Sequence, residues 1–166
     1  MVRIFGRFVG LWSWGGELPP KLGHMTSLRT FAFAALCLPM AAMAADLTIT
    51  VKDVRDASGA VFLAVYDSDA TFMKPALAKF SRKVNAAKGE IRFVFHDVPA
   101  GRYAVSSYHD QNGNGKLDTN SFGMPTEGVG FSNDAPVSGG PPAFSQAAFE
   151  SDGKSDKSIA FSLNYF

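Results

Sequence analysis

Residues 109–120, which read HDQNGNGKLDTN, hold the side chains of this chain whose types and spacing are best suited to chemistry. A calcium-binding loop places oxygen donors at positions 1, 3, 5 and 9 and a glycine at position 6, where the chain turns sharply. The same residue types stand here in that order: Asp110, Asn112, Asn114, Gly115 and Asp118. The spacing therefore predicts a calcium site, with the main-chain carbonyl of Lys116 as the ligand at position 7.

The candidate loop departs from an EF-hand at its end and in its surroundings. Position 12 is Ser121 instead of a bidentate glutamate, and the sequence predicts no flanking helices. We expect Glu127 to fold back and complete the coordination shell, and Asn120 is a further possible donor. A loop with so few carboxylates predicts weak affinity, in the range suited to extracellular calcium.

A metal-free loop is the alternative explanation of the same residues. The Asn-Gly pairs at 112–113 and 114–115 favour tight turns, and Asp and Asn side chains can accept hydrogen bonds from nearby main-chain N–H groups. The sequence leaves both interpretations open.

A catalytic alternative depends on His109, which is followed directly by Asp110 and shares its loop with Glu127. An imidazole next to a carboxylate can act as a general base, so a hydrolase using His109 with Asp110 or Glu127 is the second hypothesis. The chain has neither a serine in a nucleophile elbow nor an HExxH motif. Histidine at a strand end is more often a packed residue, and His96 is expected to face solvent in the middle of a strand.

The N-terminal part of the chain predicts export. Residues 25–44 have a basic start, a short apolar core and an Ala-Met-Ala cleavage site, which is the pattern of a signal peptide. Residues 1–24 are interpreted as a misassigned N-terminal extension. We expect a periplasmic or secreted protein that begins at Ala45, with no transmembrane segment after the signal. The single cysteine, Cys37, lies in the signal, so the exported part has neither disulfides nor a catalytic thiol.

The charge balance of the exported part excludes one class of partner. The whole chain has 16 Lys and Arg and 15 Asp and Glu; four and one of these precede Ala45, which leaves 12 and 14. This part of the chain is slightly acidic and has no basic stripe, so nucleic acid is not an expected partner.

Residues 45–166 are predicted to form one all-β domain. Apolar and polar residues alternate with a period of two, the pattern of half-buried strands, and Pro75 limits any helix within 67–79 to about a turn. The pattern predicts six or seven strands in a single antiparallel β-sandwich of the immunoglobulin-like or transthyretin-like kind. The expected strands are 47–51, 60–66, 80–86, 90–98, 102–109, 143–150 and 158–165.

One long, ordered loop, residues 110–142, is expected between the strands. It is rich in Gly, Pro, Asn and Ser and shows no strand period. The glycines of 123–130 are expected to let the main chain pass close to the sheet. Phe122, Phe131 and Phe144 are expected to anchor the loop to the core.

Three runs together resemble a known family. They are VPAGRYAV at 98–105, HDQNGNGKLDTN at 109–120 and GMPTEGVGFSN at 123–133. These runs are similar to those of DUF2141, a bacterial family of secreted proteins of unknown function. The resemblance implies an exported β-sandwich and assigns no catalytic residue.

The first functional hypothesis is therefore a non-enzymatic module of the bacterial envelope. Its long loop, ordered by calcium, would present a surface to a protein or glycan partner. The alternatives are the His109 hydrolase and a structural periplasmic domain that binds no ligand.

Overall fold

The computed structural model describes residues 45–166, so the predicted extension and signal peptide lie outside the described residues. The described part has eight strands, against the six or seven predicted. It also has two 3-10 helices and one short α-helix. Their bounds are β1 Ala45–Val54, β2 Ala60–Tyr66, η1 Pro75–Leu77, β3 Phe80–Asn85, β4 Gly89–Val98, β5 Gly101–Asp110, β6 Gly128–Phe131, η2 Ser132–Asp134, α1 Phe144–Ala147, β7 Phe149–Ser151 and β8 Lys157–Ser162.

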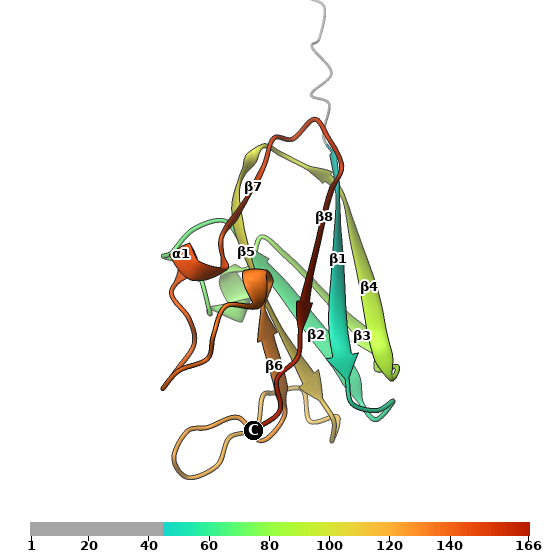
Figure 1. Cartoon of the computed structure of the whole chain (residues 1–166), viewed down its shortest axis with the longest axis vertical. Helices are drawn as coiled ribbons and strands as arrows, with labels where there is room; N and C mark the ends of the chain where they lie inside the picture. Colours follow the sequence, from blue (N-terminus) through green and yellow to red (C-terminus); the bar gives the residue numbers. More distant parts are fainter. Residues whose placement is uncertain (1–44) are drawn as a thin grey trace, which may run out of the picture. The chain divides into compact units, whose positions relative to one another are not determined.

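The strands form two sheets (Figure 1). The first has the order β4-β1-β8, and the second has the order β3-β2-β5-β6, with β7 paired to the start of β5. The main hydrophobic core combines side chains from both sheets, as in a sandwich. In β1, Leu47, Ile49 and Val51 are fully buried while the residues between them are partly exposed. The predicted alternation is confirmed here.

The prediction of a purely antiparallel fold is wrong at one pair of strands. β8 runs parallel to β1, from Leu47 beside Lys157 to Lys52 beside Ser162. Figure 1 shows the reason: the chain leaves β7, crosses one end of the sandwich and enters β8 from the end at which β1 starts. A crossover of this kind delivers a strand in the same direction as its neighbour.

Two local predictions are also corrected. The loop predicted at 110–142 is interrupted by β6, which is short and completely buried. Residues 143–150 were expected to be a strand, but they contain the single helical turn α1 before β7 begins at Phe149. Pro141 and Pro142, just before this turn, cannot donate main-chain hydrogen bonds to a sheet ladder.

The outer face of the five-stranded sheet carries a second, smaller core. It includes Tyr66, Phe72, Phe131 and Phe144, whose rings meet edge to face around Phe72. Phe131 and Phe144 therefore anchor the chain as predicted. Phe122 does not, because its side chain is 90% exposed.

The last residues of the chain connect the two sheets. After β8, the N–H of Leu163 donates to the carbonyl of Lys52 in the first sheet. Asn164 and Val129 then exchange two main-chain hydrogen bonds in the second sheet, 2.7 and 2.9 Å long. This crossing brings Tyr165 to the end of the sandwich at which β5 ends and residues 110–118 begin.

Candidate functional site: the Asp/Asn loop and the polar network beneath it

The Asp/Asn loop, residues 110–118, begins where β5 ends. β5 and β6 are antiparallel neighbours, and His109 is paired with Gly128. This pairing places Asp110 and Glu127 at the base of the segment that joins the two strands. Both acids are buried: Asp110 is 0% exposed and Glu127 is 4% exposed.

The Asp110 carboxylate holds the turn of the loop closed. Its Oδ1 accepts a hydrogen bond from the N–H of Asn114 at 3.0 Å, and its Oδ2 accepts one from the N–H of Gly115 at 2.9 Å. Gly115 has a φ of +81°, a conformation that glycine adopts without steric cost. Charged acceptors make stronger hydrogen bonds than neutral ones, so this buried carboxylate stabilises the turn.

The two asparagines use both ends of their side-chain amides. The Oδ1 atoms of Asn112 and Asn114 accept from the main-chain N–H groups of Asn114 and Lys116, which are two successive Asx turns. Their Nδ2 groups donate to the carboxylate of Asp118, at 2.6 Å from Asn112 and at 2.9 and 3.0 Å from Asn114. The hydrogen bonds of the metal-free alternative are thus present.

Glu127 fastens both ends of the loop. Its Oε1 accepts from the N–H of Gln111 at 2.9 Å, and its Oε2 accepts from the N–H of Asp118 at 3.0 Å. Its side chain therefore folds back toward the loop, and its completion of a coordination shell stays a prediction. Asn120 belongs to a separate turn, because its Oδ1 accepts from the N–H groups of Phe122 and Met124.

The donor set can be tested against the needs of calcium, which takes six to eight oxygen ligands. The side chains of Asp110, Asn112, Asn114 and Asp118 converge through their shared hydrogen bonds and are not splayed apart. However, both asparagines turn nitrogen toward Asp118, so a cation would require their amides to rotate and give up the Asx-turn bonds. Within residues 45–166 no three His, Cys, Asp or Glu side chains gather as a metal site. The residue types fit weak binding, and coordination stays a prediction.

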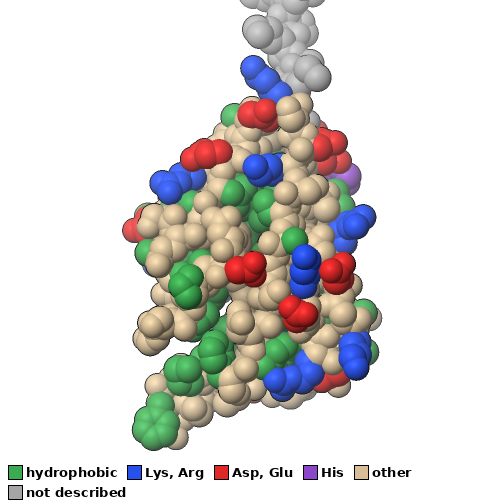
Figure 2. All heavy atoms as spheres, in the orientation of Figure 1, with side chains coloured by type: hydrophobic (Ala, Val, Ile, Leu, Met, Phe, Trp, Pro, Cys, Tyr) green, Lys and Arg blue, Asp and Glu red, His purple; other side chains and the backbone are tan. Residues whose placement is uncertain are grey.

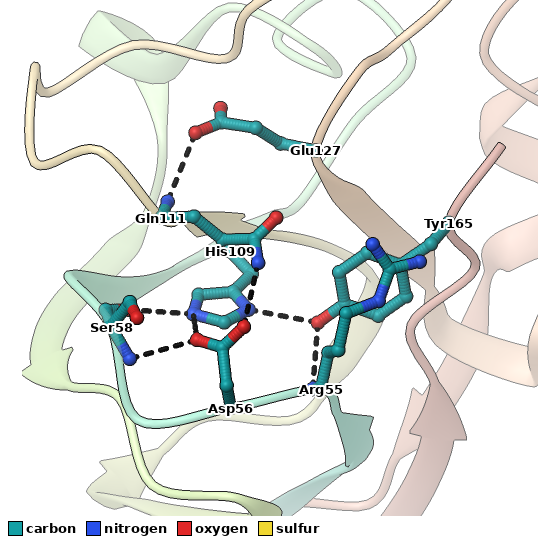
Figure 3. A network of polar contacts seen from close by, with 7 residues as sticks. All are labelled: Arg55, Asp56, Ser58, His109, Gln111, Glu127 and Tyr165. Carbon is teal, nitrogen blue, oxygen red and sulfur yellow. Dashed lines mark hydrogen bonds and ion pairs between the residues drawn. The ribbon is translucent and has the colours of Figure 1, made fainter.

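His109 lies beneath the loop in a network of polar contacts (Figure 3). It is 0% exposed. Its Nε2 is 2.8 Å from the carbonyl oxygen of Ser58, which can only accept, so Nε2 carries the proton. Its Nδ1 is 2.8 Å from the hydroxyl of Tyr165 and, in the neutral ring, accepts from it. The Tyr165 hydroxyl in turn accepts from the N–H of Arg55 at 3.0 Å.

Asp56 is the acid closest to His109 in this network. Its carboxylate accepts from the N–H of Ser58 at 2.8 Å and from the side-chain amide of Gln111 at 2.9 Å, and it lies 3.9 Å from Nε2 of His109. The hydrogen bond from the main chain of Ser58 holds the pKa of Asp56 below its usual value. The network thereby ties the β1–β2 turn to the start of the Asp/Asn loop.

Tyr165 closes the opposite side of the network. The Arg55 guanidinium stacks over its ring, 3.9 Å from the ring centroid. Burial raises the pKa of the Tyr165 hydroxyl, which keeps it protonated and able to donate to His109. Gly128 is packed against the same ring, so a side chain at that position would overlap it. The expected close approach of the glycine-rich segment is seen at Gly128 and Gly130, against Tyr165 and β8, but not at Gly123, which has open space around it.

This geometry does not supply what the hydrolase hypothesis needs. A general base must reach the proton of a bound substrate, but both ring nitrogens of His109 are engaged and the ring is enclosed. Both carboxylate oxygens of Glu127 are likewise occupied by main-chain N–H groups. His96 is exposed, as expected, and its Nδ1 lies 2.9 Å from Oδ2 of Asp46.

Sequence reasoning missed the partners of His109. Arg55, Asp56, Ser58 and Tyr165 come from segments far from the loop in sequence. Two weak signals were available. Asp56 precedes Ser58-Gly59, a typical Asx turn, and the alternation near the C-terminus places Tyr165 on the same face as the buried Phe161 and Leu163.

Fold and site together define the class: a two-sheet β protein with an Asp/Asn loop built on buried carboxylates. The chain belongs to the family described as "Uncharacterized protein conserved in bacteria (DUF2141)", whose family model matches residues 49–159. This confirms the resemblance found in the sequence. No curated protein and no solved structure matches the chain. Among residues 45–166, no helix has the length and apolar character to cross a bilayer.

Proposed function

We propose that this protein is a non-enzymatic module exported to the bacterial envelope, in which a weak calcium site in the Asp/Asn loop stabilises a surface for a protein or glycan partner. Within the sandwich class we place it with immunoglobulin-like and transthyretin-like domains. The observation that carries the proposal is the enclosure of the acids and the histidine. Asp110, Glu127 and His109 hold main chain and side chains in place instead of facing a cleft.

The exposed surface beyond the loop supports a binding role. Asn120 organises a turn on which Phe122 stands almost fully exposed. A large apolar side chain held outward on an ordered turn is a common anchor at protein interfaces. Figure 2 shows hydrophobic side chains gathered at the lower left, where Figure 1 draws this segment.

Calcium binding is tested by thermal unfolding of the purified protein in millimolar calcium and in EDTA. A ligand that binds only the folded state stabilises it by about 2.7 kcal/mol at 100 times its Kd, so we expect a higher Tm in calcium. Asp118→Asn keeps the size of the side chain, removes one charge and should abolish the increase. Asp152→Asn is the control, because Asp152 is another acid that accepts hydrogen bonds within a turn, there from the main-chain N–H groups of Lys154 and Ser155.

Equal Tm values in calcium and EDTA would leave the metal-free structural domain as the better account. If calcium still raises the Tm of Asp118→Asn, but no longer does so after substitution of another acid, the ion binds elsewhere. The quantity to compare between variants is the increase in Tm caused by calcium, not the Tm itself. This separates ion binding from any loss of hydrogen bonds at Asp118.

Export is tested separately by cell fractionation and intact-protein mass. The expected product lies in the envelope or medium and begins at Ala45. A cytoplasmic product that retains residues 1–44 would contradict the proposal.

The partner surface is tested by placing a photo-crosslinking amino acid at position 122 in cells. A discrete adduct is expected there and not at position 77, where Leu77 is also exposed (54%). The same adducts at both positions would mean that Phe122 does not mark a specific surface.

A further inference from the structure

The outer face of the five-stranded sheet is apolar along β2 but only partly covered. β2 turns Val61, Leu63 and Val65 into the main core, so Phe62, Ala64 and Tyr66 lie on the other face. Tyr66 is buried in the second core. Phe62 and Ala64 border an open groove of about 450 Å³, which falls within the usual range of small-molecule sites, about 300–1,000 Å³.

Side chains from three strands form the floor of this groove. Phe62 and Tyr108 are opposite each other on β2 and β5, and their rings stack with centroids 4.8 Å apart. Ala64, Ser81 and Ser106 continue the floor along the next row of the sheet. The floor is therefore a rigid, mainly apolar surface with hydroxyl groups along one side.

Two loops form the walls. Met73 and Pro75 line the groove from the segment after β2, and residues 115–117 line it from the Asp/Asn loop. The hydroxyl of Tyr108 donates to the carbonyl of Gly115 at 3.2 Å, which fixes the second wall to the floor. A smaller groove of about 240 Å³ shares Met73 and Leu117 with this one and continues past them over Val129 and Phe131.

The charged side chains that border the groove are basic, while Asp110 and Glu127 lie close enough to Tyr108 to add to the effect of burial in raising its pKa. Lys116 lines it, and the ammonium group of Lys83 lies 4.6 Å from the centroid of the Phe62 ring. Neither lysine forms an ion pair with a described residue, and no acid lines the groove. The groove therefore favours an anionic group near its lysines.

Both faces of the Phe62 ring are already covered. Phe62 presents one face to Tyr108 and the other to Lys83, so neither face is free for a sugar or an aromatic ring to stack upon. The groove instead offers ring edges and the side chains of Met73 and Leu117. These suit a flexible alkyl chain, because burial of its apolar surface is favourable in any orientation.

We propose that this groove binds a single-chain amphiphile with a carboxylate head group, whose alkyl chain lies on the Phe62–Tyr108 floor and whose carboxylate lies near Lys83 and Lys116. The long axis leads past Met73 and Leu117 into the smaller groove. The groove borders the proposed calcium loop at residues 115–117, but the proposed ligand uses the side chain of Lys116 and not the main-chain carbonyl assigned to calcium.

The test is a calorimetric titration of the full-length protein with decanoate and, as the neutral match, 1-decanol. We expect saturable binding of one decanoate, at least several-fold tighter than decanol. The double variant Lys83→Ala/Lys116→Ala should bind decanoate about tenfold more weakly, since two partly exposed ion pairs together contribute on the order of 1–2 kcal/mol. The control is Lys88→Ala/Lys154→Ala, which removes the same charge from exposed positions elsewhere.

Absence of saturable binding would overturn the proposal, and so would equal affinities for decanoate and decanol. An equal loss in the control variant would show that net charge, not the groove, attracts the anion. A third variant, Ala64→Trp, fills the floor and should abolish binding with both lysines retained. These measurements change neither the calcium concentration nor Phe122, so absence of decanoate binding would leave the proposed envelope function standing.

Discussion

The hydroxyl of Tyr165 lies 2.8 Å from Nδ1 of His109, although 56 positions separate the two residues in the chain. The contact joins the half-buried C-terminal segment to the base of the Asp/Asn loop, at one end of the sandwich. The Tyr165 hydroxyl also accepts from the N–H of Arg55, and Nε2 of His109 donates to the carbonyl of Ser58. The network explains why a histidine next to a carboxylate serves structure here.

Removal of the Tyr165 hydroxyl should destabilise the fold. Tyr165→Phe leaves Nδ1 of His109 buried without a donor, which costs about 1–3 kcal/mol in the free energy of unfolding. Tyr108→Phe is the control, because water can replace the partly exposed hydroxyl that bonds Gly115, and we expect a change within about 0.5 kcal/mol. Urea denaturation of the two variants measures both values, and equal losses would contradict the assignment of a buried network.

Gly128 and Tyr165 should be energetically coupled. Gly128→Ala forces a methyl group against the Tyr165 ring and should cost about 1–3 kcal/mol through overpacking. In a Tyr165→Ala background the space is free, so the same substitution should cost at least about 1 kcal/mol less. A double-mutant cycle in denaturant measures this coupling. The cycle of Gly128→Ala with Phe149→Ala should be additive, because Phe149 lies in β7 beside the start of β5 and Gly128 lies beside its end.

The Glu127 carboxylate should control the order of the Asp/Asn loop. Glu127→Gln replaces one acceptor with an amide that faces an N–H donor, and the loss of a charged hydrogen bond costs about 1.5–3 kcal/mol. Hydrogen exchange at the amides of Gln111 and Asp118 should accelerate. The control is Glu150→Gln, at an exposed acid, which should leave the exchange rates of both amides unchanged. Unaltered exchange in Glu127→Gln would show that other contacts hold the loop.

Alkaline pH should weaken the protein through its tyrosines. Burial raises the pKa of Tyr103, Tyr108 and Tyr165 above the ordinary value of 10.0. Because the folded pKa exceeds the unfolded one, the stabilisation is fully present below pH 10 and is lost as the pH rises through the folded value.

Two measurements check this pH dependence. An absorbance titration of tyrosinate should show delayed ionisation in the folded state relative to the urea-unfolded chain. Tyr165→Phe should reduce the fall in stability above pH 10. If the folded and unfolded titrations coincide, burial of these hydroxyls is not the cause.

Much of the fold could be predicted because strands with one buried face show their period locally. Leu47, Ile49 and Val51 alternate with polar residues, and this alone places them in a core. The Asp/Asn loop was recognisable for the same reason: its hydrogen bonds connect residues two to five positions apart, so its spacing reflects its geometry.

The other features depend on contacts between distant segments. Phe122 was expected to be an anchor because it is large and apolar, but its place on a separate turn leaves it exposed. The short strand β6 has no clear alternation, since all four of its residues are buried and two are glycines.

The amino-acid sequence by itself was enough to predict a β domain, an Asp/Asn loop and the family to which the chain belongs. Only the tertiary structure decided that β8 lies parallel to β1 and that His109 is enclosed between Ser58 and Tyr165. The physical reason is range. Periodicity and turn chemistry act over a few residues, whereas strand order and the burial of a polar side chain depend on which remote segments pack beside it.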